Sequence, residues 1–105
     1  MALVRGANPS EEPEATTVVI EIRAYDPARG VGSWNEKGTT LRAEVFTDPE
    51  PTVVISGNPA GLTSLARHLL TLAQEGVPDG RHFDFDTYCG WLAEDSMALR
   101  LEVER

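Results

Sequence analysis

The stretch GNPAGLTSLARHLLTLAQEGVP, residues 57–78, decides the fold because it predicts one strong helix. Asn58 suits the N-cap, and Pro59 suits the first helical position, where its missing N–H is not needed. Gly76 lies where a left-handed residue would end the helix, and Pro78 prevents its continuation. Apolar residues between these ends recur with a period of 3.6 residues. They are Leu62, Leu65, Ala66, Leu69, Leu72 and Ala73, and we expect this stripe to pack on the core.

Polar residues occupy the other side of the predicted helix. They are Thr63, Ser64, Arg67, Thr71, Gln74 and Glu75. We expect them to face solvent, since an amphipathic helix turns its polar side away from the core. His68 lies at the border of the apolar stripe, so we expect its ring to reach solvent as well.

Five further segments alternate between apolar and polar residues or are short apolar runs, which is typical of strands. They are residues 17–25, 41–45, 52–56, 81–86 and 97–104. Turn-forming stretches rich in Gly and Pro separate most of them. The order βββαββ predicts an α+β fold, with a mostly antiparallel sheet of about five strands and one amphipathic helix packed on one face.

The domain organisation follows from length and composition. Residues 1–16 bring prolines and like charges with few apolar side chains, and predict a disordered acidic tail. Residues 17–105 predict a single α+β domain.

The charge balance excludes some partners. Nine Lys and Arg stand against seventeen Asp and Glu, a formal charge of −8, so we expect no nucleic-acid partner, which would need clustered cations. The chain has no run of about 18 apolar residues, so we expect no membrane-spanning segment. The negative charge also argues against binding to an anionic membrane surface. Cys89 is the only cysteine, which fits a reducing, cytoplasmic location.

The sequence gives only weak support for catalytic or metal-binding residues. His82, Asp84 and Asp86 alternate along one predicted strand, about 7 Å apart, so all three cannot easily reach one metal ion. No spacing brings Cys89 together with a histidine base and an orienting group, as a cysteine nucleophile requires. We expect no catalytic residues, no metal site and no cofactor.

Interaction residues are better supported than catalytic ones. With the helix on one side, the other side of the predicted sheet would present Glu21, Arg23, Arg42, Glu44, Asp84, Asp86, Arg100, Glu102 and Glu104. Trp34 lies in a long predicted loop, where aromatic anchors often become binding hot spots; the alternative is that its ring folds over an end of the helix–sheet core. We expect Trp91, in a second loop, to fold over the core instead.

The C-terminal half resembles a known family. The run VISGNPAGLTSLARHLLTLAQ (residues 54–74), Val77-Pro78, HFDFD (82–86) and DSMALRLEVER (95–105) are similar to the immunity protein 32 family over about residues 52–105. That resemblance implies a bacterial antidote to a polymorphic toxin, and it carries no catalytic residues. The bulky segment at residues 89–92 departs from the simple turn expected there.

The leading hypothesis is a non-enzymatic protein that occludes the active site of a cognate toxin with an acidic surface. We expect that surface to be led by Asp84, Asp86, Glu94, Asp95, Glu102 and Trp34. One alternative is a structural or regulatory module forming a homodimer through the open sheet face or an edge strand. A third is a small enzyme or small-molecule carrier, with a pocket between the helix and the Trp91 loop lined by Cys89, His68 or Tyr88.

Overall fold

The helix α1 spans Pro59–Leu72 in the computed structural model, which describes residues 14–105. Its N-cap is Asn58, whose side-chain oxygen accepts from the N–H of Gly61 at 2.7 Å. The same oxygen accepts from the N–H of Thr40 at 3.1 Å, which ties the start of the helix to the chain before the first strand. Beyond the C-cap, Gly76 has a φ of +89°, which glycine adopts without steric cost. The predicted helix and its start are confirmed, but the helix ends at Leu72 with Ala73 as its C-cap, earlier than the predicted end at Gly76.

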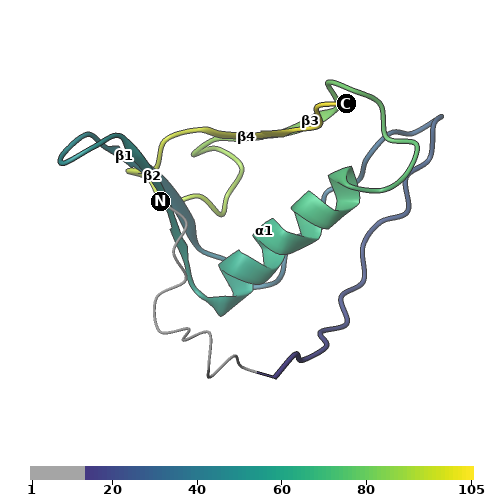
Figure 1. Cartoon of the computed structure of the whole chain (residues 1–105), viewed down its shortest axis with the longest axis horizontal. Coiled ribbons are helices and arrows are strands. Elements are labelled where there is room, and N and C mark those ends of the chain that lie inside the picture. Colours follow the sequence, from purple (N-terminus) through teal and green to yellow (C-terminus); the bar gives the residue numbers. More distant parts are fainter. Residues whose placement is uncertain (1–13) are drawn as a thin grey trace.

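Four strands accompany the helix in two antiparallel sheets (Figure 1). β1 (Leu41–Phe46) pairs with β2 (Thr52–Gly57), and β3 (His82–Phe85) pairs with β4 (Leu99–Glu102). The order along the described chain is therefore ββαββ. The α+β class is confirmed, but the expectation of one sheet of about five strands is wrong.

The connection between β3 and β4 explains why the sheets stay separate. The N–H of Leu41 donates to the Trp91 carbonyl at 3.2 Å, and the Leu41 carbonyl accepts from Ala93 at 2.9 Å. Farther along β1, the Ala43 carbonyl accepts from Met97 at 2.9 Å. This irregular connection thus occupies the β1 edge that does not face β2, so neither β3 nor β4 can bond there.

The predicted strand at residues 17–25 is also wrong, because the segment joins no ladder. Side chains of α1 and the residues that follow it take up its backbone groups instead. Arg67 donates to the carbonyl of Glu21, Gln74 Nε2 donates to that of Arg23 at 2.9 Å, and Gln74 Oε1 accepts from the N–H of Tyr25 at 3.0 Å. The predicted tail at residues 1–16 lies outside the described residues except for its last three.

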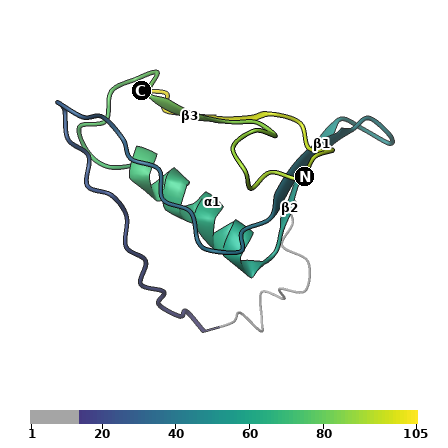
Figure 2. The ribbon, with the colours of Figure 1, turned by 180° about the vertical axis from the view of Figure 1, so that it is seen from behind.

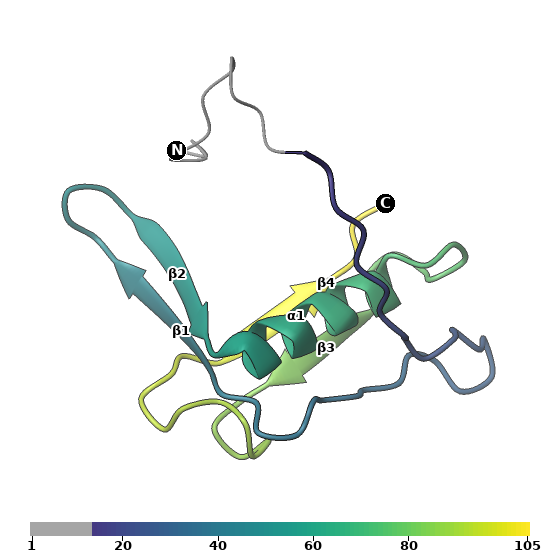
Figure 3. The same cartoon turned by 90° about the horizontal axis from the view of Figure 1, so that it is seen from below.

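The core lies between α1 and the inner face of β3–β4 (Figure 3). Its buried members are Leu41, Leu72, Phe83, Phe85, Trp91 and Leu92. His68 lies among them, with its ring centroid 4.8 Å from that of Phe83 and 4.9 Å from that of Phe85. The alternation expected in residues 81–86, with both phenylalanines inward, and the core position of Trp91 are confirmed.

The helix faces the core with a different side from the one that we expected. The residues it buries are Gly61, Ser64, Arg67, His68, Thr71 and Leu72. Leu62, Leu69 and Leu70 are instead about half exposed. The expectation that Ser64, Arg67 and Thr71 face solvent is therefore wrong, as is the expected exposure of His68, whose exposed fraction is 0%.

A hydrogen-bond network offsets the desolvation free energy of these buried polar groups, which is small once the groups are paired. Ser64 Oγ lies 2.7 Å from Thr39 Oγ1 and accepts from the N–H of Glu36 at 2.8 Å. The hydroxyl of Thr71 donates to the Arg67 carbonyl at 2.7 Å. The guanidinium of Arg67 is paired with the Glu36 carboxylate. The chain at residues 33–39 thus covers the polar side of α1.

Candidate partner-binding surface

The outer side of β3–β4 carries a row of charged residues that we call the acidic face. It consists of Asp84, His82, Arg100 and Glu102 on the two strands, and of the exposed acids Asp86 and Glu104 just beyond the ends of β3 and β4. The pairing register places Asp84 opposite Arg100 and His82 opposite Glu102. Because side chains alternate along a strand, Phe83 on the same strand points the other way, into the core.

Arg100 organises this face. Its Nε lies 2.7 Å from Asp84 Oδ1 and its Nη2 lies 3.2 Å from Oδ2. This bidentate hydrogen bond orients the carboxylate. Arg100 Nη1 also lies 3.5 Å from Glu102 Oε1. The Arg100 hydrogen bond holds the pKa of the Asp84 carboxyl below its usual value of 3.8, which keeps Asp84 ionised at neutral pH.

His82 completes the group across the two strands. Its Nδ1 donates to the Gly80 carbonyl at 2.9 Å, and its Nε2 lies 3.3 Å from Asp84 Oδ2. Asp84, Glu102, Arg100 and His82 therefore form one connected cluster, and the four acids of the face outnumber its single arginine.

The other predicted acids lie along the connection between β3 and β4. Asp86 Oδ1 accepts from the N–H of Tyr88 at 2.8 Å, so this carboxylate shapes the turn that leaves β3. Asp95 Oδ1 lies 3.0 Å from Arg42 Nε, which fastens the connection to β1. Glu94 precedes it and is exposed. The structure brings Asp84 and Glu102 together and places Asp95 beside β1.

Trp34 does not join the acidic face. Its ring is half-buried, with the guanidinium carbon of Arg67 4.1 Å and that of Arg23 5.1 Å from the ring centroid. Arg67 belongs to α1, which packs on the inner side of β3–β4, whereas the acidic face is the outer side. Trp34 thus stacks with two cations and holds residues 17–25 near the helix.

A second surface was missed from the sequence. Four apolar residues of α1 and one at its C-cap, which we call the leucine face, are exposed, namely Leu62, Ala66, Leu69, Leu70 and Ala73. Val45, Val53 and Ile55 share one face of β1–β2 and are exposed as well. The small residues Gly61 and Ser64 were the sequence signal for the packed side of α1. The structure shows why a glycine is needed there, since a Cβ on Gly61 would lie 1.9 Å from the Thr40 carbonyl oxygen. That contact marks the side of α1 against which the chain packs closely.

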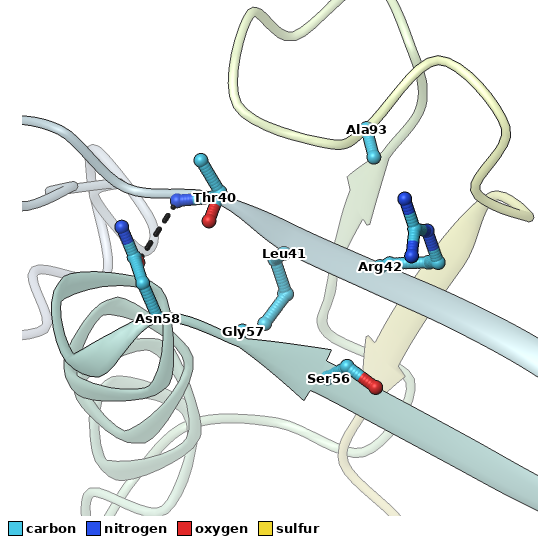
Figure 4. A pocket seen from close by; sticks show the side chains of 7 residues that line it. All are labelled: Thr40, Leu41, Arg42, Ser56, Gly57, Asn58 and Ala93. Carbon is cyan, nitrogen blue, oxygen red and sulfur yellow. Dashed lines mark hydrogen bonds between the residues drawn. The ribbon is translucent and has the colours of Figure 1, made fainter.

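A pocket of about 270 Å³ lies where β1, β2 and the start of α1 meet (Figure 4). It is lined by Thr40, Leu41, Arg42, Ser56, Gly57, Asn58 and Ala93. None of the three residues expected to line a small-molecule site contributes to it. Cys89 and Tyr88 are exposed, and His68 Nε2 is engaged at 3.0 Å by Ser33 Oγ. Between residues 14 and 105, no helix has the length and apolar character needed to span a bilayer.

Comparison with known families gives a match over this surface. The sequence model of the family described as immunity protein 32 matches residues 52–105, just over half of the chain. The matched segment contains β2, α1, β3 and β4, and with them the whole acidic face. Trp34 and residues 17–25 lie outside it. No curated protein and no solved structure matches the chain.

Proposed function

The chain belongs to the immunity protein 32 family, and from this membership we propose that it is a non-enzymatic, protein-binding domain that neutralises a cognate bacterial toxin. The observation that carries the proposal is the family match, which spans both strands of the acidic face. The alternative of a self-associating module concerns contacts between copies of the chain and is a separate property.

The proposed mechanism is occlusion. A toxin that cleaves nucleic acid needs a basic cleft for its substrate, and a protein with a formal charge of −8 is attracted to such a cleft from a distance. The acidic face suits this role because Arg100 holds the carboxylates of Asp84 and Glu102 in set positions. Side chains that are already ordered lose less conformational entropy when the partner binds.

The acids at residues 94 and 95 extend the proposed contact along the connection between β3 and β4. Asp95 is held by Arg42, so this part of the surface is also ordered before binding. Trp34 belongs to the proposed contact only if the toxin reaches around the domain, since the ring lies on the inner side of β3–β4. We therefore place the centre of the contact on Asp84, Asp86 and Glu102, with Glu94 and Asp95 at its border.

Isosteric neutralisation tests this mechanism. The double variant Asp84→Asn/Glu102→Gln keeps side-chain shape and removes two charges, and Asp48→Asn/Glu50→Gln at the β1–β2 turn is a charge-matched control on two other exposed acids. In cells that co-express a cognate toxin, we expect the control to protect growth fully. The double variant should bind the purified toxin about tenfold more slowly, because less charge steers the encounter. Equal association rates for the double variant and the control would contradict a role for the acidic face.

A further inference from the structure

Residues 17–25 have the composition of a strand but only one occupied edge. Successive residues of an extended chain direct their N–H and C=O groups to opposite sides. The groups bonded to Arg67 and Gln74 belong to Glu21, Arg23 and Tyr25, all odd-numbered. The odd-numbered backbone groups therefore face the helix, and the even-numbered groups face away from it.

The outward edge is free in the described part of the chain. Across residues 14–105, no hydrogen bond engages the backbone of Ile20, Ile22 or Ala24. The segment runs along the side of α1 that is remote from β3–β4 (Figures 1 and 2). Val18 and Val19 are 80% and 90% exposed. A β-branched segment with a free edge is ready to accept another strand.

We propose that this edge pairs antiparallel with the same segment of a second copy of the chain. The free groups belong to even-numbered residues, so the hydrogen-bonded pairs must join even-numbered residues of both copies. With Ile22 opposite Ile22 of the second copy, Ile20 lies opposite Ala24. Glu21 then lies opposite Arg23 of the second copy, and the two-fold symmetry repeats that pair.

The charges of the segment favour this register and favour a second copy of the chain as the partner. A shift that centres the pairing on Ile20 or on Ala24 leaves Glu21 opposite Val19 or Pro27, so the unlike charges no longer meet. In the Ile22 register the charged pairs are non-hydrogen-bonded pairs, in which side chains lie closest. The segment also has no net charge, because Glu21 and Arg23 are its only charged residues. Two acidic copies can therefore approach each other here without strong repulsion.

Cysteine cross-linking in a Cys89→Ser background tests the register in the full chain. Ile22→Cys places the two sulfur-bearing residues opposite each other, with Cα atoms about 5.5 Å apart, a separation that suits a disulfide. Ile20→Cys is the matched control at an equally half-buried isoleucine, because residue 20 of the two copies would lie about 13 Å apart. We expect rapid oxidation to a covalent dimer for the first variant and slow oxidation for the control.

Light scattering of charge variants tests whether the edge pairs with a second copy of the chain. Glu21→Arg should weaken the dimer about fivefold, since it sets like charges opposite each other, and Glu21→Gln, which removes the charge and leaves Arg23 in place, should weaken it less. A chain that stays monomeric at its highest soluble concentration overturns the proposal, as does equal cross-linking of the two cysteine variants. Pairing of this edge with a toxin strand while the free chain stays monomeric overturns it too. Every dimer measurement is made without toxin, so it stands or falls separately from toxin neutralisation.

Discussion

His68 shows how one residue connects burial to pH dependence. Its Nδ1 donates to the Ser64 carbonyl at 2.6 Å, which leaves Nε2 as the acceptor for the Ser33 hydroxyl. Burial lowers the pKa of His68 from its usual 6.5, and the nearby charge of Arg67 lowers it further, although the Ser64 hydrogen bond acts in the opposite direction. The folded protein therefore holds a neutral imidazole in its core.

This lowered pKa predicts a loss of stability in mild acid. Below pH 6.5 the unfolded chain takes up a proton at His68 that the folded chain does not, so the free energy of unfolding falls as the pH falls. One such proton gives a slope of at most about 1.4 kcal/mol per pH unit. Urea denaturation between pH 7.5 and 5 measures it.

The two histidines of the chain provide a matched comparison. His68→Gln should flatten this acid dependence while lowering stability overall, whereas His82→Gln should retain it, because His68 is still present. Asp84 acts in a different window, since its lowered pKa makes stability fall only as the pH drops below the usual carboxyl value of 3.8. An unchanged slope in His68→Gln would contradict the neutral, buried state of His68.

At the scale of elements, helix α1 separates two leucines that look equivalent in the sequence. Leu72 is 4% exposed and belongs to the core cluster, whereas Leu69 is 48% exposed. Leu72→Ala should destabilise the protein by about 2–4 kcal/mol, because it leaves a cavity in the core. Leu69→Ala should cost less than about 1 kcal/mol. Denaturant titrations of the two variants measure both values, and equal losses would show that the leucine face is buried.

The same helix shows what periodicity can and cannot predict. The N-cap at Asn58 is a local signal, so the start of the helix was predictable. The end was less so, because the helix stops at Leu72, before the glycine signal at Gly76. The side that packs on the core was not predictable, because Ser64, His68 and Thr71 repeat with the same helical period as the leucines. Their burial depends on partners such as Ser33 and Thr39, which lie more than twenty residues away in the sequence. Single-sequence patterns do not contain such long-range pairings.

The predicted strands also differ in how well the sequence could predict them. Residues 41–45, 52–56 and 81–86 were predictable as strands because apolar and β-branched runs end at clear turn signals. Residues 17–25 have the same pattern but meet side chains of Arg67 and Gln74 where a neighbouring strand would lie. Of the predicted site, Asp84 and Glu102 were placed together by strand alternation and pairing. Trp34 could not be placed, since nothing local reveals its stacking on Arg67.

At the scale of the whole molecule, the two proposed contacts lie on different parts of the domain. The acidic face is the outer side of β3–β4, and residues 17–25 lie on the remote side of α1 (Figure 1). A toxin bound at one contact therefore leaves the other accessible. The proposed dimer would present two acidic faces, each able to bind one toxin.

The central claim is toxin capture by charge, and the salt dependence of the association rate tests it most directly. The measurement is stopped-flow mixing of the full chain with a purified cognate toxin domain, at increasing sodium chloride. We predict an association rate that falls by about tenfold or more between low and physiological ionic strength, because salt screens the attraction between the acidic face and a basic cleft. A rate independent of salt, or no complex with that toxin, would contradict the account.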